Sequence, residues 1–334
     1  MRDDQVATID SVAARAAISR IAIETPVLAA PELDERVSAH VWLKLENLQV
    51  TGSFKVRGAA NKILALSDGE RERGVVACSS GNHGRAVAYV ADLLDVHATV
   101  CVPEWVDPTK LHAIRKHRAE TILHGGTYDE AEARSYEIQR ERGSVYVHPF
   151  DDPYVIAGQG TIGLELLEQI PMLDTVVVPL SGGGLISGIA VALKRAEPLM
   201  RVVAVSAANA RVMHESLEEG KPIAFPEEET IANALSGGIG LKNSYTFELV
   251  RDLVDEYLLV SEEEMRDAMA FAATEYKVVV EGGGAVGIAA LLCGKFSGRG
   301  ENVAVVVSGG NVEAQAVAQL AAERGAVNGL DTEG

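Results

Sequence analysis

From residue 40 onward, short runs of β-branched and other apolar residues alternate with longer segments of helical periodicity, which constrains the fold strongly. Near-continuous apolar runs separated by helices are typical of parallel strands that helices cover on both faces. Helices are predicted between the runs, and three examples are 83–94, 129–142 and 262–276. Strands are predicted at 41–46, 74–79, 98–103, 120–125, 174–180, 201–206, 255–260 and 302–308. The sequence therefore predicts an α/β protein with mainly parallel sheets.

Two breaks in this alternation indicate how the chain divides into domains. The stretch HPFDDPYV at 148–155 carries two prolines and interrupts the rhythm, and a second crossing is expected near residue 47. A chain of 334 residues is long enough for two domains. We therefore expect a small, mobile domain at 48–150, inserted into a large domain formed by 1–47 and 151–334.

Charge and cysteine content narrow the class of partner. With 30 basic and 48 acidic residues the formal net charge is −18, which argues against nucleic-acid and anionic-membrane partners. The three cysteines are far apart, so they form neither a disulfide framework nor a zinc motif. The apolar runs are too short to span a membrane, and the N-terminus does not resemble a signal peptide. We expect a cytoplasmic protein that acts on a small molecule.

Residues 51–58 read TGSFKVRG and place a lysine at an unusual position. Lys55 follows a Thr-Gly-Ser-Phe turn, has the aromatic Phe54 beside it, and begins a segment with apolar residues at helical spacing. Two interpretations are open. Lys55 is either an ordinary, solvated residue of a first helical turn or a lysine placed in a pocket for chemistry.

A glycine-rich loop lies in the stretch VVVPLSGGGLISGIAVAL at 176–193, between a predicted strand and a predicted helix. Such a loop directs backbone N–H groups and a helix N-terminus at an anion, commonly a phosphate. The alternative is a tight turn without a ligand, which three successive glycines disfavour. A dinucleotide site is disfavoured because Ser187 replaces the third glycine of its fingerprint and the next strand ends at Ser206 rather than at an acid. A Walker A motif is absent.

Two further turns carry hydrogen-bonding residues at strand ends. The stretch CSSGNHGRA at 78–86 is rich in donors suited to a carboxylate, although Asn82 and His83 could merely cap the helix that they begin. The stretch VVVSGGNV at 305–312 ends the last predicted strand with Ser308. Each turn alone is a weak signal.

The motifs TGSFKVRGA, SSGNHG, SGGGLISG and VVSGGN, in this order, resemble the fold-type II pyridoxal-phosphate enzymes, specifically the threonine/serine dehydratase and serine racemase family. The resemblance extends from about residue 12 to 320 and implies a tryptophan synthase β-like fold with two three-layer α/β/α domains. It implies the cofactor pyridoxal 5'-phosphate, which stabilises a carbanion at the substrate α-carbon. Lys55 looks like the lysine that binds the cofactor covalently and then removes the α-proton. Loss of the β-hydroxyl as water, followed by hydrolysis of the resulting imine, would give a 2-oxo acid and ammonia.

The resemblance also implies roles at the cofactor. Phe54 is expected to pack against it, Asn82 to hydrogen-bond its ring hydroxyl, and Ser308 to face its pyridine nitrogen. A neutral hydroxyl at that nitrogen favours elimination over transamination. The loop that holds the phosphate is expected to be Ser181, Gly182, Gly183, Gly184 and Leu185, and two further cofactor-site residues are expected to be Gly238 and Glu281.

The substrate carboxylate is expected to bind at a second loop, which the resemblance also identifies. Ser80 has two open roles, because it can only bind substrate or it can act as the acid on the face opposite Lys55. The loop consists of Ser79, Ser80, Gly81, Asn82 and His83.

The sequence departs from the family pattern where many relatives bind an activating divalent cation. Ser206 and Val212 stand where those relatives have acidic residues. A hard cation needs several oxygen ligands, so we expect no metal ion at that site. Monovalent-cation binding stays open.

Other departures point to a subgroup. The stretches EGGGA at 281–285 and ANALSGGIG at 232–240 look most like the hydroxyectoine utilization dehydratases, which are assigned a dehydratase/ammonia-lyase step. No C-terminal regulatory domain is expected. Family members are usually dimers or tetramers, so a homodimer or homotetramer is expected.

Several alternatives stay open at this point. Within the same fold they are an amino-acid racemase, a 3-hydroxyaspartate dehydratase, and a synthase that replaces the β-substituent with a thiol. The synthase is disfavoured because its carboxylate loop would read Thr-Ser-Gly-Asn-Thr-Gly. Outside enzymes of this fold, a non-catalytic sensor or scaffold would be expected to lack Lys55, and a nucleotide-dependent oxidoreductase would need the missing dinucleotide fingerprint.

Overall fold

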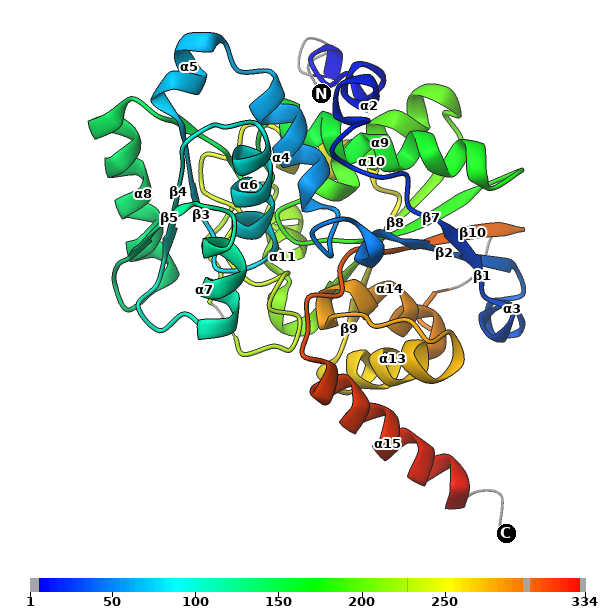
Figure 1. Cartoon of the computed structure of the whole chain (residues 1–334). Helices are drawn as coiled ribbons and strands as arrows, with labels where there is room; N and C mark the ends of the chain where they lie inside the picture. Colours follow the sequence, from blue (N-terminus) through cyan, green and yellow to red (C-terminus); the bar gives the residue numbers. More distant parts are fainter. Residues whose placement is uncertain (1–5, 227, 297–300, 331–334) are drawn as a thin grey trace.

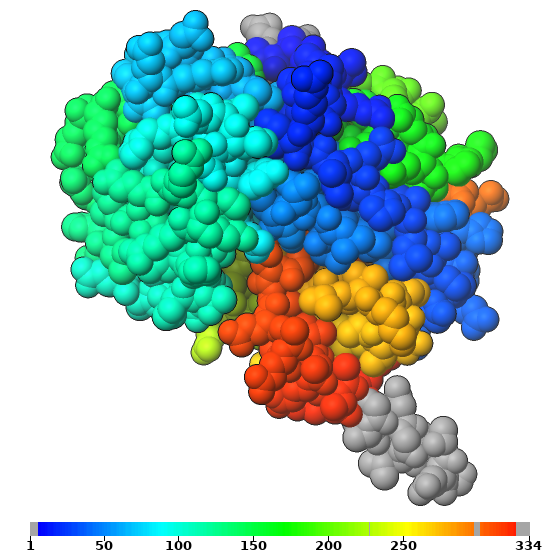
Figure 2. All heavy atoms as spheres, viewed as in Figure 1, coloured from blue at the N-terminus to red at the C-terminus, as the bar shows by residue number. Residues whose placement is uncertain are grey.

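A larger and a smaller sheet, each with helices packed against it, make up the molecule (Figure 1). The computed structural model of the chain describes residues 6–226, 228–296 and 301–330. Figure 2 shows the smaller-sheet part (cyan to green) and the C-terminal part (orange to red) meeting on one face of the molecule.

The larger sheet has six strands in the order β1-β2-β10-β7-β8-β9, and only the β1–β2 pair is antiparallel. Alternate residues of its central strand β10 face opposite sides, with Val305 packed among α13 and α14 and Val306 among α9 and α10. Side chains that alternate in this way let a strand contribute to two cores. The strands are β1 (Val27–Ala29), β2 (His40–Leu45), β7 (Thr175–Pro179), β8 (Arg201–Ala207), β9 (Glu256–Val260) and β10 (Asn302–Val307).

The smaller sheet has four parallel strands in the order β5-β4-β3-β6, formed by chain segments between β2 and β7. Helices α4 and α6 cover one face, where they pack on Val75 and Val100, and α8 covers the other face, where it packs on Val76 and Cys101. The strands are β3 (Val75–Cys78), β4 (Ala98–Val102), β5 (Glu120–Leu123) and β6 (Val145–Tyr146).

Fourteen helices and two short 3-10 turns connect the strands in the described part of the chain. Within that part, no helix is long and apolar enough to cross a membrane. The helices are α2 (Ser11–Ile18), α3 (Pro31–Val37), α4 (Lys55–Leu64), α5 (Asp68–Arg73), α6 (Asn82–Leu93), α7 (Pro108–Arg115), α8 (Tyr128–Arg142), α9 (Pro153–Gln169), α10 (Gly184–Ala196), α11 (Val212–Glu218), α12 (Thr246–Leu253), α13 (Glu262–Glu275), α14 (Gly282–Leu292) and α15 (Ala314–Leu330); the 3-10 turns are η1 (Glu46–Leu48) and η2 (Ala208–Ala210).

The eight predicted strands and the three example helices are confirmed, with ends that differ by at most two residues. Two strands were not predicted, β1 and β6. They have three and two residues, too few for an alternating pattern to stand out from the neighbouring loops.

Glycines allow α9 to pack closely between α4 and α10. A Cβ atom on Gly158 would lie 2.6 Å from the Arg57 carbonyl oxygen and 2.7 Å from the Cα atom of Gly58, so the α4 and α9 backbones touch there. A Cβ atom on Gly188 would lie 2.3 Å from the Ile156 carbonyl oxygen, so α9 and α10 touch as well. These two crossings hold the helix that begins with Lys55 and the helix that follows the glycine loop against one common helix.

Gly158→Ala is expected to lower the free energy of unfolding by about 1–3 kcal/mol, because the new methyl group would press on rigid backbone atoms of α4. Urea unfolding would measure the loss. Gly69→Ala is the matched control, since Gly69 is exposed in α5 and its Cβ would have only a flexible Arg73 atom at 3.6 Å. A stability of Gly158→Ala equal to that of this control would show that the crossing can relax.

A network of four buried charges fastens α4 to the rest of the large-sheet part. Arg57 donates from Nε and Nη2 to the Glu46 carboxylate, both at 2.8 Å, and from Nη1 to Glu165 Oε1 at 2.5 Å. Lys44 Nζ donates to Glu165 Oε2 at 2.6 Å. None of the four side chains is more than 4% exposed. Two positive and two negative charges balance, as burial of charge requires.

Candidate functional site

Lys55 is partly buried and hydrogen-bonded, so its amine does not extend freely into solvent. It is half-buried at the start of α4, its Nζ atom donates to the Pro149 carbonyl oxygen at 2.7 Å, and that atom lies 5.1 Å from the centroid of the Phe54 ring. Burial lowers the pKa of the Lys55 amine to about 8, although the nearby Glu281 carboxylate raises it. An amine with this pKa is neutral, and thus nucleophilic, in a useful fraction of molecules near neutral pH.

Asn82, which begins α6 beside the smaller sheet, contacts Glu281, which precedes α14 beside the larger sheet. Asn82 Nδ2 donates to Glu281 Oε1 at 2.6 Å, and burial raises the pKa of the Glu281 carboxyl. Asn311 Nδ2 donates to Asn82 Oδ1 at 2.7 Å and to the Thr51 carbonyl oxygen at 2.9 Å. The Asn82 amide therefore makes one donated and one accepted hydrogen bond, and it keeps a further N–H and a further lone pair for a ligand. The interpretation that Asn82 merely caps its helix is wrong, because Gly81 occupies the cap position of α6 and no side chain caps it.

Sequence reasoning missed the role of Asn311 in this group. The residue lies in the quoted stretch at 305–312, but only Ser308 was selected there. Its partners Asn82 and Thr51 are remote in sequence, so only the position within a glycine-rich turn could have drawn attention to it.

The first and last motifs lie against each other. Phe54 donates its backbone N–H to the Ser308 carbonyl oxygen at 3.1 Å, and Gly310 donates its N–H to the Gly52 carbonyl oxygen at 2.9 Å. Ser308 is 4% exposed at the end of β10, and its hydroxyl has only a long contact of 3.4 Å to the Gly283 carbonyl oxygen. The length of that contact leaves the Ser308 hydroxyl with unused hydrogen-bonding capacity.

The glycine loop follows β7 and begins α10, as predicted. Gly183 takes a positive φ of 86° at the N-cap position of α10, and no side chain caps this end of the helix. The first-turn N–H groups of α10 are thus suited to a phosphate. Ser181 Oγ donates to the Leu235 carbonyl oxygen at 2.7 Å, and Leu185 is buried. A Cβ atom on Gly182 would lie 2.3 Å from the Phe150 ring, so glycine is needed there.

The SSGNHG loop ends β3 and begins α6. Ser79 Oγ accepts from the Gly81 N–H at 3.1 Å, and Ser80 beside it is half-buried. His83 is 4% exposed and donates from Nε2 to the Val147 carbonyl oxygen at 2.8 Å. Burial, with a smaller contribution from the Lys55 charge, lowers the pKa of His83 to about 3, so the ring is neutral near pH 7.

Gly238, a further predicted cofactor-site residue, lies in the loop that precedes α12. It is exposed, and a Cβ atom there would meet only the Gly240 nitrogen at 4.0 Å. The segment that contains it is nevertheless connected to the glycine loop through Leu235, which accepts the hydrogen bond from Ser181.

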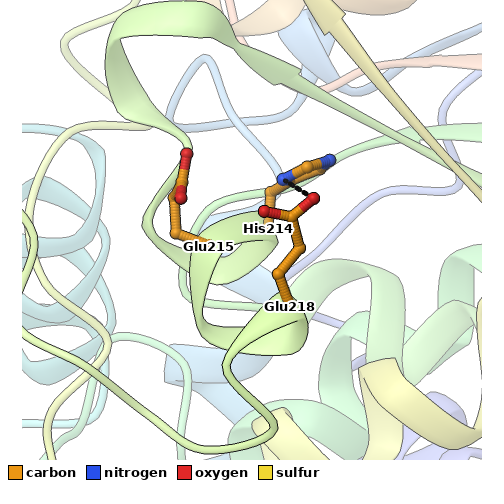
Figure 3. Close-up of side chains that lie close together, drawn as sticks. All are labelled: His214, Glu215 and Glu218. Atoms are coloured by element: carbon orange, nitrogen blue, oxygen red, sulfur yellow. Dashed lines mark ion pairs between the residues drawn. The ribbon is translucent and has the colours of Figure 1, made fainter.

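One group of potential metal ligands, His214, Glu215 and Glu218, occurs among the described residues (Figure 3). All three lie on α11, with ligand atoms within 4.8 Å of one another, but Glu215 Oε1 already accepts from Arg211 Nε at 2.6 Å. The buried Ser206 hydroxyl donates to the Leu180 carbonyl oxygen at 2.8 Å. The absence of a metal ion at the position of Ser206 stays a prediction.

The residues present fit pyridoxal phosphate, since a partly buried amine of low pKa contacts Pro149 and the uncapped N-terminus of α10 lies against the neighbouring Phe150. A family model described as pyridoxal-phosphate dependent enzyme matches residues 18–309. The chain belongs to this family. It depends on pyridoxal phosphate, and the fold class implied by the sequence resemblance is confirmed.

Similar proteins include both lyases and racemases. An L-threonine ammonia-lyase of Thermotoga maritima is 46% identical over 86% of this chain and 71% of its own length. A catabolic L-threonine dehydratase of Escherichia coli is 39% identical over 95% of this chain and 97% of its own length. The structure of maize serine racemase has a TM-score of 0.87 and 37% identity, covering 96% of this chain and 97% of the racemase. The chain is a pyridoxal-phosphate-dependent lyase of the threonine dehydratase kind.

Proposed function

We propose that this lyase eliminates water from a β-hydroxy-α-amino acid and so releases a 2-oxo acid and ammonia. The observation that carries the proposal is the Lys55 amine, which is held at the Pro149 carbonyl oxygen and has a pKa of about 8. The relatives named as L-threonine ammonia-lyases and dehydratases support the same reaction class.

Bound pyridoxal phosphate supplies the electron sink for the α-carbon. We assign the phosphate to the N-terminus of α10, with Ser181 through Leu185 around it, and the ring to the space between Phe54, Asn82 and Ser308. Lys55 holds the cofactor and takes the α-proton at Nζ, because a neutral amine is a competent base near its own pKa. Gly238 and Glu281 complete the cofactor site in this proposal.

The substrate carboxylate is assigned to the loop at 79–83, at the start of α6. Backbone N–H groups at a helix start bind anions, and no side chain caps this helix. The loop hydroxyl of Ser80 then lies with the substrate. If Ser80 acts as an acid on the face opposite Lys55, the protein is a racemase, which is the second candidate because maize serine racemase is similar.

The subgroup resemblance favours a hydroxylated diamino acid from hydroxyectoine breakdown as the natural substrate. Threonine, serine and 3-hydroxyaspartate are the alternatives. We further propose a cytoplasmic homodimer or homotetramer, in which the domain at 48–150 moves against the large domain formed by 1–47 and 151–334.

The test is product analysis on purified protein supplied with pyridoxal phosphate. L-threonine, L-serine, 3-hydroxyaspartate and a hydroxylated diaminobutyrate would each be scored for 2-oxo acid and for the mirror-image amino acid. We expect a visible band at roughly 410–420 nm and 2-oxo acid from at least one substrate. Formation of the mirror-image amino acid alone would replace the lyase proposal with the racemase, and an absent band would contradict the assignment of Lys55.

A further inference from the structure

A six-residue segment, 147–152, contacts most parts of the candidate site. It connects β6 to α9 and is called the strap below. Its Val147 carbonyl oxygen accepts from His83, its Pro149 carbonyl oxygen accepts from Lys55, and its Phe150 ring presses on Gly182. The strap therefore contacts the carboxylate loop, the lysine and the phosphate loop within four consecutive residues.

Asp151 extends these contacts to a fourth part of the molecule. Its Oδ2 atom accepts from the Ser244 N–H at 2.6 Å, and its Oδ1 atom accepts from the N–H groups of Tyr245 at 2.8 Å and Thr246 at 2.9 Å. Tyr245, which occupies the cap position of α12, contributes no side-chain cap of its own. A carboxylate that lies more than ninety residues earlier in the chain thus caps this helix, and its negative charge suits the helix N-terminus.

The segment 235–244, which precedes α12 in the chain, is held at both ends. Leu235 accepts from Ser181 of the phosphate loop, and the residues from Ser244 onward donate to Asp151 of the strap. The residues between them, 236–243, form no helix or strand and include the exposed Leu241. A loop of this length can reach the site in only a few ways once both ends are fixed.

We propose that Asp151 is a positioning residue that fixes the loop 236–243 over the substrate side chain, and that this loop determines side-chain specificity. The inference rests on the proposed function. Asp151 and the Lys55 contact at Pro149 belong to the same strap, so the distance between loop and lysine depends on the bonds that Asp151 makes. A displacement of about 1 Å at such a position can cost on the order of a hundredfold in rate.

Asp151→Asn tests the proposal with little change in shape. The amide has one acceptor oxygen where the carboxylate has two, so its NH₂ group must face at least one N–H donor of the segment 244–246. We expect kcat/KM for the best substrate to fall about ten- to a hundredfold, mainly through KM, and the ratio between L-threonine and L-serine to change. Amide hydrogen exchange across 236–246 is expected to accelerate, while the visible cofactor band stays.

Asp10→Asn is the matched control. Asp10 also caps a helix, α2, by accepting from the N–H groups of Val12 at 3.1 Å and Ala13 at 2.9 Å, but within the described part of the chain it makes no hydrogen bond to a residue of the site. Its variant is expected to keep wild-type kinetics. Asp151→Glu, which retains the charge and both oxygens, is expected to restore part of the lost kcat/KM.

The outcomes separate this inference from the proposed function. If Asp151→Asn keeps the KM, the substrate ratio and the exchange rates of the wild type, the role of Asp151 is overturned. An equal loss of kcat/KM in Asp10→Asn would overturn it as well. If Asp151→Asn does not fold, the same measurements on Asp151→Glu decide, because wild-type values there would contradict a position-dependent role. A wild-type protein without the visible band or 2-oxo acid release would instead overturn the proposed function.

Discussion

Lys55→Ala is expected to lower turnover by about 10³-fold or more, the largest activity loss of any single substitution in this chain. The variant loses both the amine that holds the cofactor and the base that we assign to the α-proton. The visible band of the wild-type protein is expected to be absent. Stopped assays for 2-oxo acid and an absorption spectrum of the dialysed variant would measure both effects.

Lys194→Ala is the control for this substitution. Lys194 lies in the last turn of α10, where its Nζ atom pairs with Asp255 at 2.8 Å, and among the described residues it makes no hydrogen bond or ion pair to the candidate site. The variant is expected to keep the band and the activity. A Lys55→Ala protein that retains the band and turns over substrate would contradict the assignment.

The pKa of Lys55 adds a pH signature to the same prediction. Because burial lowers this pKa from its usual value to about 8, the amine is neutral above pH 8 and protonated below it. The rate at which cofactor-free protein takes up pyridoxal phosphate is therefore expected to rise with pH, with a midpoint near 8, and to level off about one pH unit above that midpoint. A midpoint near the ordinary lysine value of about 10.4 would show that the amine is solvated.

Glu165→Gln is expected to cause a large loss of stability, about 3–5 kcal/mol in the free energy of unfolding. The carboxylate of Glu165 accepts from Arg57 and from Lys44, and Lys44 is 0% exposed. A neutral side chain at this position leaves two buried cations with only the Glu46 carboxylate to balance them. Burial already lowers the pKa of Lys44 despite its anionic partners, which indicates how costly the charge is there.

Urea unfolding would measure this loss, with Glu168→Gln as the matched control for Glu165→Gln. Glu168 lies one turn further along α9 and pairs with Arg15 at 2.5 Å, but their side chains are 58% and 34% exposed. Exposed pairs contribute roughly 0–1 kcal/mol, so Glu168→Gln is expected to unfold nearly as the wild type does. Equal losses in the two variants would show that burial of the network contributes nothing.

Much of the fold could be predicted because the relevant signals are local. The apolar runs of β7 and β10 are continuous because both faces of these strands are covered, and that pattern is visible in the sequence itself. The four motifs are likewise local, since each is a turn at a strand end or helix start. They were sufficient to indicate the family and its cofactor.

Only the tertiary structure decided the contacts between those motifs. Lys55 meets Pro149, 94 residues away, and Asn82 meets Glu281, 199 residues away. No pattern within a single segment indicated which partners Asn311 would bind. The same holds for the cap that Asp151 provides to α12 and for the ion network around Arg57. A hydrogen bond depends on where two atoms lie in space, and periodicity within a segment carries no information about which remote segment will face it. The sequence alone therefore predicted most of the elements and singled out Lys55 as the candidate lysine, whereas packing decided which side chains surround it.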